Sequence, residues 1–205
     1  YHWASARLDG FVVQGLLDSQ ARREQPNAVY FPYVEPRVGA GKGLLEALAQ
    51  RACVVVTDDF PCFFLPRMIA AAADRMPALD ESVDSDGIWP MRASEQVFTT
   101  AHSFRRYLQK HVPEHLGIKP AADPLSDAEV PRLASLPERV TTNWDPARLD
   151  QLLSDGGLDP LPIDHEVGPA AMRGGPDSAR KALARFLDKN LDRYVTERNV
   201  PDEEA

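Results

Sequence analysis

Residues 52–76 read ACVVVTDDFPCFFLPRMIAAAADRM, and this stretch decides the predicted fold. Its first part, Cys53–Thr57, is a short apolar run rich in β-branched side chains, which is typical of a buried parallel strand. Pro66 suits the first turn of a helix, because its missing N–H would have no partner there in any case. The alanine-rich run behind it has high helix propensity. The stretch therefore predicts a strand, a loop over Asp58–Phe64 and a helix.

The predicted loop is acidic and aromatic, and it leaves the carboxyl end of the strand. Ligands of open α/β sheets collect at that edge, so Asp58, Asp59 and Phe60 are candidate ligand-facing residues. Turn and helix-cap chemistry is the alternative that we favour for the two aspartates. Core packing is the favoured alternative for the three aromatic residues, Phe60, Phe63 and Phe64. Two adjacent carboxylates with no histidine close in sequence are a weak ligand set, so we predict no metal site.

Composition limits the classes of protein to which the chain can belong. Its 205 residues and 43% hydrophobic content are ordinary for one large globular domain, or one domain and part of another. A net charge of −8 and a pI near 5.1 argue against a surface coated for nucleic acid. The two cysteines, Cys53 and Cys62, indicate free thiols in a reducing compartment. With no apolar run of about 20 residues and no visible signal peptide, we expect a soluble, cytoplasmic protein.

The neighbouring segments extend the strand and helix into an α/β fold. Apolar residues at helical spacing begin at Leu8 and continue to Leu17. Further strand candidates lie at Ala28–Val34, where Pro32 weakens the pattern, and at Leu79–Val83. Strands that alternate with helices predict a Rossmann-like, doubly wound parallel sheet. Because a helix and not a strand comes first, we expect a partial sheet with at least one βα unit missing upstream.

A glycine-rich turn precedes a short predicted helix at Leu44–Arg51. Glycines at Gly39, Gly41 and Gly43 would let backbone N–H groups face an anion at a helix N-terminus. The segment resembles a phosphate-binding P-loop only superficially, because Pro36 stands where the first glycine belongs and no Ser or Thr follows the lysine. We therefore favour a tight surface turn and keep anion binding as the alternative.

Another amphipathic helix is predicted after the strand at Leu79–Val83. Its apolar residues recur at helical spacing: Val97, Ala101, Phe104 and Leu108. Its polar side carries a basic cluster: Arg105, Arg106 and Lys110. A solvated helix face is the favoured interpretation of this cluster, and phosphate contact is the alternative.

From Pro113 to Gly175 the sequence loses long periodic segments and gains prolines and glycines. We interpret this part as a long connection over the surface, with short helical pieces at Leu133–Leu136 and Ala147–Leu153. The histidines have no metal-ligand spacing and are interpreted as structural or exposed: His102, His111, His115 and His165.

The last predicted helix runs from Pro176 to about Arg198. One face of it is apolar and needs a partner to cover it: Leu183, Phe186, Leu187, Leu191 and Tyr194. We expect this helix to open a second, helical domain that continues beyond the chain. The predicted division is an α/β domain at 1–93, a helix and interdomain connection at 94–175, and the start of the helical domain at 176–205.

Two parts of the chain resemble DNA photolyases, most closely the class II-like cyclobutane pyrimidine dimer photolyases of bacteria. VVTDDFPCFFLPRM at 55–68, with YFPYVEPRVGAGKGLLEALA at 30–49, is similar to their amino-terminal α/β domain. ALARFLDKNLDRYVTERNVPDEEA at 182–205 is similar to the helix that opens their flavin domain, and it carries the pattern FLxxxLxxYxxxRNxP. The two parts occur in the order expected for the family.

The resemblance implies a light-driven DNA repair enzyme, a deoxyribodipyrimidine photolyase. Excited, fully reduced FAD would pass an electron to a flipped-out thymine dimer, the cyclobutane ring would split, and the electron would return. Tyr194 matches a tyrosine that contacts FAD, and Arg198 matches an arginine near the DNA-binding face. The loop with Asp58, Asp59 and Phe60 would lie where the family can carry an antenna pigment, a deazaflavin, flavin or folate. From the residues alone, Tyr194 is a core tyrosine and Arg198 a cation that favours a helix C-terminus.

The resemblance also implies that much of the parent protein lies outside this chain. In the family the last helix leads into a Thr-Ser-x-Leu-Ser segment that binds the FAD phosphates. We therefore expect the 205 residues to hold no catalytic residue, to bind FAD weakly or not at all, and to lack repair activity. UV-damaged DNA would bind through the missing helical domain, and we expect a monomer with no membrane partner.

Functions from other classes remain open. A cryptochrome-type light sensor would share the fold and FAD but would signal through a partner protein. A stand-alone nucleotide-binding α/β protein would use the turn at Gly39–Gly43 and the loop at Asp58, although the apolar stripe of the last helix counts against it. A purely structural interaction module is the weakest of the alternatives.

Overall fold

The structure is a computed structural model, and it describes residues 3–22, 28–122, 124, 131 and 133–201. The chain divides into two compact units. Unit 1 comprises Tyr1–Gly41, Pro131–Leu133 and Asp145–Ala205, and unit 2 comprises Lys42–Val130 and Ala134–Trp144. The division predicted at 1–93, 94–175 and 176–205 stays a prediction.

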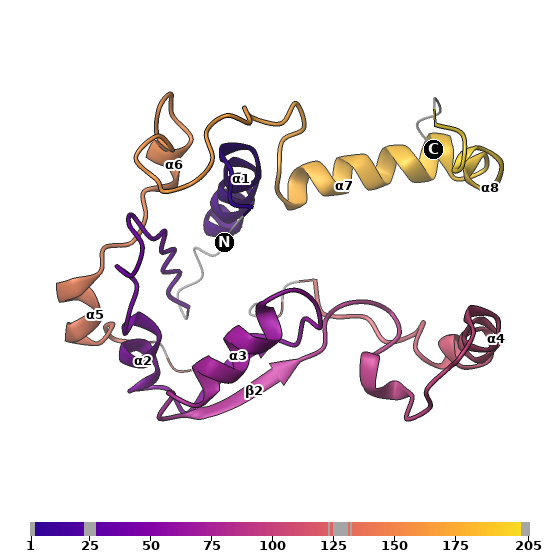
Figure 1. Ribbon diagram of the computed structural model, residues 1–205, viewed down its shortest axis with the longest axis horizontal. Coiled ribbons are helices and arrows are strands. Elements are labelled where there is room, and N and C mark those ends of the chain that lie inside the picture. Colours follow the sequence, from indigo (N-terminus) through magenta and orange to yellow (C-terminus); the bar gives the residue numbers. More distant parts are fainter. Residues whose placement is uncertain (1–2, 23–27, 123, 125–130, 132, 202–205) are drawn as a thin grey trace. The chain divides into compact units, whose positions relative to one another are not determined.

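Unit 2 contains the predicted strand, loop and helix as one βαβ unit (Figure 1). β1 (Val54–Asp58) pairs in parallel with β2 (Leu79–Val83), in register from the first residue of each strand to the last. α3 (Leu65–Ala73) connects the strands and has Pro66 in its first turn. The strand predicted at Cys53–Thr57 is therefore confirmed with a shift of one residue, and the second strand is confirmed at its predicted bounds.

β1 is not buried on both faces, contrary to the prediction. Val55 and Thr57 are half-buried on one face, whereas Val56 is 60% exposed on the other. α2 (Leu44–Ala49) and α3 line an apolar pocket with Val55, Val56 and Thr57 of β1. The protein is thus a mixed helix-and-strand protein whose described residues form a two-stranded parallel sheet. The finer, doubly wound arrangement is not confirmed.

The strand predicted at Ala28–Val34 is wrong, because this segment pairs with no strand in the part of the chain that the structure describes. Its polar groups bond to other segments of unit 1 instead. The Tyr30 hydroxyl donates to the Leu16 carbonyl at 3.2 Å, and the Ala147 amide donates to the Pro32 carbonyl at 2.7 Å. Pro32 has no N–H to offer a neighbouring strand, which removes one ladder hydrogen bond from the segment.

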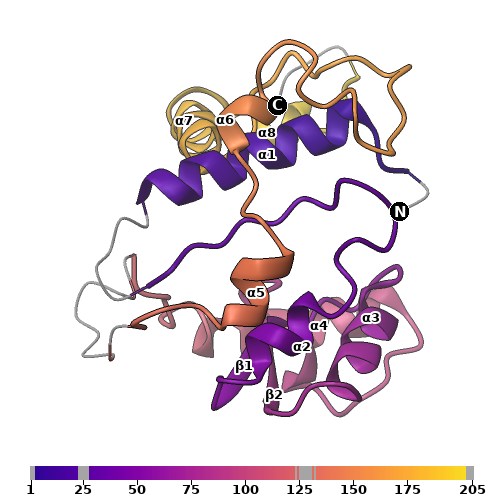
Figure 2. The ribbon, with the colours of Figure 1, turned by 90° about the vertical axis from the view of Figure 1, so that its left-hand side faces the viewer.

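Unit 1 is built on α1 (Ala6–Arg22), the helix predicted near the start of the chain. It packs against α6 (Leu149–Leu152) and α7 (Pro176–Arg185), as Figure 2 shows. Leu149 is fully buried in this unit. α6 is a shorter form of the helical piece predicted at Ala147–Leu153.

A second helix pair lies in unit 2, where α2 packs against α5 (Glu138–Asn143) (Figure 2). Val140 and Trp144 are buried there. The helical piece predicted at Leu133–Leu136 is wrong, because the described residues of that range are not helical. Pro137 disfavours the helical conformation in the residue before it, and α5 begins directly after it.

α4 (Ala101–His111) is the helix predicted after the second strand. Thr100 caps it, because its hydroxyl accepts a hydrogen bond from the Ser103 N–H at 3.2 Å. Val97 was predicted on the apolar face of this helix, but it lies before the helix and is 94% exposed. Short 3₁₀ turns flank α4: η1 (Met91–Ala93) and η2 (Val112–Glu114).

The last predicted helix starts at Pro176 as expected but is interrupted before Arg198. A π-helical segment, η3 (Phe186–Asn190), continues α7, and α8 (Tyr194–Glu197) follows after a turn. The Leu191 N–H donates to the carbonyl five residues earlier at 2.9 Å, the spacing of a π-helix. Leucines of the predicted stripe are exposed: Leu183, Leu187 and Leu191.

Within the ranges that the structure describes, none of the helices combines the length and the apolar character needed to cross a membrane.

Candidate functional site

The candidate ligand site lies where β1 and β2 end. Because the strands are parallel, their carboxyl ends meet at one edge of the sheet. The Asp59 N–H donates to the Val83 carbonyl at 2.8 Å, so the pairing continues one step beyond β1. Side chains from the end of β1 and from the loops after both strands form what we call the acidic edge: Asp58, Asp59, Asp84 and Asp86.

Both aspartates predicted as ligand-facing have partners within unit 2. The Ser85 hydroxyl donates a hydrogen bond to Asp58 Oδ1. Arg92 Nη2 lies 2.7 Å from Asp59 Oδ2, and this arginine side chain is largely exposed whereas the carboxylate is mostly covered. These contacts fit the turn interpretation, and they also hold both carboxylates at the edge where ligands of α/β sheets bind.

The side chain of Asp84, the first residue after β2, accepts two backbone hydrogen bonds. Asp84 Oδ1 accepts from the Asp86 N–H at 3.3 Å, and Asp84 Oδ2 accepts from the Met91 N–H at 2.5 Å. Burial, and then the negative charges of the other three aspartates, raise the pKa of Asp86 above its ordinary value. Aspartates from both strand ends therefore act on Asp86, although α3 and β2 separate the two pairs of aspartates in sequence.

The aromatic residues of the loop are less buried than predicted. Phe60 is half-buried, but Phe63 is 81% exposed and Phe64 is also exposed. Core packing is therefore wrong for Phe63 and Phe64, because the helices cover the sheet face and not the loop beyond the strand end. Phe63 has a φ of 59°, in the left-handed region that non-glycine residues seldom adopt.

The chemistry of the acidic edge favours some ligands over others. Four carboxylates attract cations and N–H donors and repel phosphates. Nowhere among the described residues are three or more His, Cys, Asp or Glu side chains arranged to hold a metal ion. The edge thus offers hydrogen-bond acceptors, and the Phe63 ring of the same loop is exposed.

The segment Gly39–Gly43 forms a tight turn, which is the interpretation that the sequence favoured. Gly39 has a φ of 85° and Gly43 a φ of 90°, both in the left-handed region. The Gly41 N–H donates to Glu35 Oε1 at 2.9 Å. The Glu35 carboxylate therefore already accepts the hydrogen bond from a backbone N–H that a bound anion would otherwise use.

Tyr194 and Arg198 lie together at the end of unit 1. The Tyr194 ring meets the Phe186 ring edge to face at 5.5 Å, and the Arg198 guanidinium lies 5.8 Å from the Tyr194 ring centroid. Arg193 and Glu197 form an ion pair at 2.9 Å beside them. Tyr194 is 39% exposed, so the core interpretation of this residue is wrong. Tyr194 belongs to unit 1 and the acidic edge to unit 2.

Sequence patterns missed an aromatic cluster in unit 2. The His115 ring packs edge-on against Trp89 at 4.7 Å, and the His111 ring lies 4.3 Å from the Tyr107 ring. Phe98 lies 4.9 Å from Tyr107. These two histidines are structural, as predicted, and the cluster holds one face of α4.

No protein-family model matches the chain, and neither does any curated protein.

Proposed function

We propose that this chain is part of a light-driven DNA repair flavoenzyme of the photolyase type, which splits cyclobutane pyrimidine dimers by electron transfer from excited, reduced FAD. One observation carries the proposal. VVTDDFPCFFLPRM, which resembles the α/β domain of photolyases, forms β1, the loop and the start of α3 in a βαβ unit, and this acidic, aromatic loop stands at the carboxyl edge of the sheet.

The βαβ unit supports a doubly wound, Rossmann-like sheet in the parent protein. Parallel strands joined by a helix are the repeating unit of such sheets. The uncovered face of the present sheet is largely apolar, with Val54, Val56, Leu79 and Val83 all exposed. A doubly wound sheet buries both faces under helices, so helices of the complete protein would cover this one.

In this proposal Tyr194 and Arg198 belong to the FAD and DNA end of the protein. FAD supplies the light-driven electron, and the residues of the chain bind and orient it. Tyr194 is exposed, and its ring contacts the Phe186 ring and the Arg198 guanidinium. An accessible ring suits contact with a flavin, and the adjacent guanidinium suits a nucleic-acid phosphate.

The acidic edge is proposed as the place of an antenna pigment, a deazaflavin, flavin or folate. The rings of these pigments carry N–H groups that can donate hydrogen bonds to carboxylates. Asp58 and Asp59 would orient the pigment, and Phe60 would pack beside it. Asp59 Oδ2 forms an ion pair with Arg92. This pair would position the other carboxylate oxygen, Oδ1, for a hydrogen bond from the pigment.

A repair assay on the product of the complete native gene tests the proposed function. The protein, loaded with reduced FAD, is mixed with an oligonucleotide that carries a thymine dimer, in blue light and in darkness. Restoration of intact thymines in light alone supports the proposal. FAD loading without repair would favour the cryptochrome-type sensor, and the absence of both would contradict the proposal.

A further inference from the structure

α4 has two faces of opposite character. One face is apolar and aromatic, and Phe104 and Leu108 line a cavity of about 420 Å³ with Trp89, Met91 and Phe98. Tyr107 and His111 on the same side of the helix are half-buried in the aromatic cluster. These contacts fix the rotation of α4 about its axis, so the opposite face is held toward solvent.

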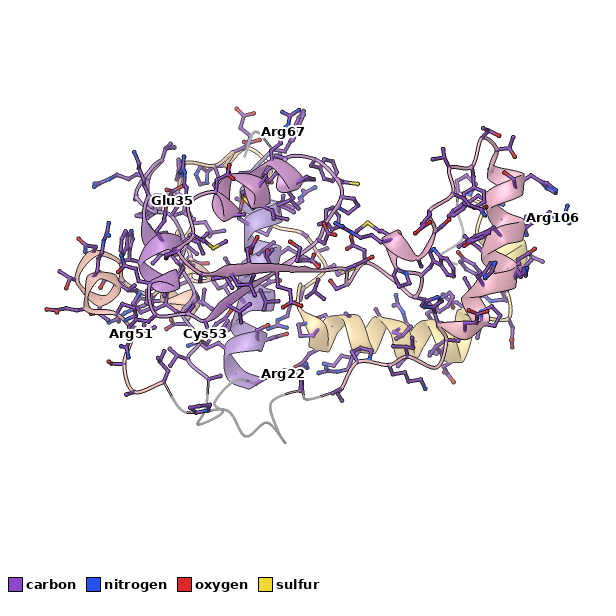
Figure 3. All side chains as sticks on the ribbon, turned by 90° about the horizontal axis from the view of Figure 1, so that it is seen from below. Arg22, Glu35, Arg51, Cys53, Arg67 and Arg106 are labelled. Carbon is purple, nitrogen blue, oxygen red and sulfur yellow. The ribbon has the colours of Figure 1, made fainter. Side chains whose placement is uncertain are left out.

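The opposite face is cationic. Arg105, Arg106 and Lys110 are exposed, and in the described part of the chain none of them forms an ion pair or a hydrogen bond. Figure 3 shows Arg106 extending outward from the α4 ribbon. Lys110 lies four residues after Arg106, so the two share one side of the helix. We call Arg105, Arg106 and Lys110 the cationic face.

No carboxylate of α4 neutralises the cationic face, because α4 contains no Asp or Glu. Five other described arginines pair with carboxylates, whereas exposed arginines such as Arg37, Arg75 and Arg148 are unpaired but scattered; the paired ones are Arg22, Arg92, Arg173, Arg180 and Arg193. What distinguishes the cationic face is that its unpaired cations are grouped on one helix. Like charges four residues apart, such as those of Arg106 and Lys110, repel each other and weaken a helix. An anionic partner would remove this repulsion, which makes a bound anion more favourable here than at an isolated cation.

We propose that the cationic face of α4 binds the phosphate backbone of DNA through Arg105, Arg106 and Lys110. Guanidinium groups match phosphate oxygens in a two-pronged geometry, and an extended row of phosphates can meet several cations of one helix face at once. The choice of DNA as the polyanion rests on the proposed function, whereas the cationic face itself does not. Because the chain as a whole carries −8, binding is confined to this face and falls steeply with salt.

The test measures binding of the 205-residue chain to an undamaged, fluorescein-labelled DNA duplex by anisotropy as salt is raised. Three phosphate contacts predict a slope of log Kobs against log salt of about −3, and a loss of about 40-fold in affinity between roughly 50 and 200 mM salt. The variant R105Q/R106Q/K110Q should lose most of the binding. Its slope should be close to zero, because each cation that is removed reduces the slope by about one.

Two further variants separate the cationic face from overall charge. The control R37Q/R75Q/R148Q removes the same charge from three exposed, scattered arginines and should keep the slope. The variant R105K/R106K keeps the charge and should keep the slope also. Far-UV circular dichroism checks that each variant retains its helices.

The outcomes are distinct from those of the flavin and repair assays. Equal loss of binding in the control, or unchanged binding in R105Q/R106Q/K110Q, would overturn the inference. Competition by polyglutamate as strong as by duplex DNA at equal charge would assign the face to acidic protein and overturn it too. DNA binding by this chain, together with a complete protein that takes up no flavin and repairs no dimer, would leave the cationic face established and refute the proposed function. Repair by the complete protein, together with an unaltered salt slope in R105Q/R106Q/K110Q, would support the proposed function and overturn the inference about the cationic face.

Discussion

Asp18 and Arg173 form a two-pronged ion pair although they lie 155 residues apart in sequence. Arg173 Nη2 donates to Asp18 Oδ1 at 2.6 Å, and Nη1 donates to Oδ2 at 3.0 Å. The Asp18 carboxylate is only 10% exposed. Hydrogen bonding from Arg173 lowers the pKa of Asp18 below its ordinary value of 3.8. The pair fastens the segment before α7 to α1 and so fixes where the last helical segment starts.

Acid should weaken unit 1 through this pair. The pKa of Asp18 is lower in the folded than in the unfolded chain, so its stabilisation is complete above about pH 4 and is lost as pH falls through the lowered pKa. Asp18→Asn should lower the midpoint of thermal unfolding at neutral pH and matter less in acid. Asp188→Asn, at an exposed carboxylate, is the control. A difference between Asp18→Asn and the native chain that stays constant with pH would contradict this account.

Gly174 should not tolerate a side chain. A Cβ at this position would overlap the Phe11 carbonyl oxygen of α1. Gly174→Ala should therefore lower the free energy of unfolding by about 1–3 kcal/mol, measured by urea denaturation. Gly168→Ala is the matched control, because nothing lies within 4 Å of its Cβ position. Equal stabilities of the two variants would refute the close approach.

Leu149 should be the most sensitive leucine of unit 1. It is 1% exposed, so Leu149→Ala leaves a cavity and should cost about 2–5 kcal/mol in the free energy of unfolding. Leu183→Ala, at an exposed position, should change stability by no more than about 0.5 kcal/mol. If the exposed leucine proved the costlier one, the assignment of the unit 1 core would fail.

Tyr194 should affect flavin binding in the complete protein. If its ring packs on FAD, Tyr194→Ala should weaken FAD binding about tenfold, which corresponds to about 1.4 kcal/mol, whereas Tyr194→Phe keeps the ring and should change little. Val195→Ala, at the exposed neighbouring position, is the control. Flavin fluorescence titration of the apoprotein measures the difference. Equal FAD affinity in all three variants would remove Tyr194 from the site.

Local sequence patterns were sufficient for the elements whose signals lie within a few residues. The β-branched run before Asp58 and the proline-led alanine run predicted β1 and α3 to within a residue or two. Ala28–Val34 has a similar strand-like composition, but a strand requires a neighbour with free backbone groups, and composition does not show whether one exists. The π-helical FLDKN segment contains no residue that signals a break, so the interruption of the last helix was not predictable.

The candidate site was predictable only in part. Asp58 and Asp59 were predicted as site residues because they directly follow the strand predicted at Cys53–Thr57. Their grouping with Asp84 and Asp86 depends on the parallel pairing of β1 with β2, which is a tertiary contact. The pairing of Asp18 with Arg173 joins residues of ordinary surface composition across most of the chain, and no local pattern distinguishes them from other charged residues.

The measurement that tests the central claim most directly is a visible absorption spectrum of the protein purified from its complete native gene. A photolyase-type flavoenzyme should show oxidised-flavin bands that bleach on photoreduction. A colourless, stably folded protein that takes up no FAD would contradict the account, and it would leave the nucleotide-binding α/β protein as the leading alternative.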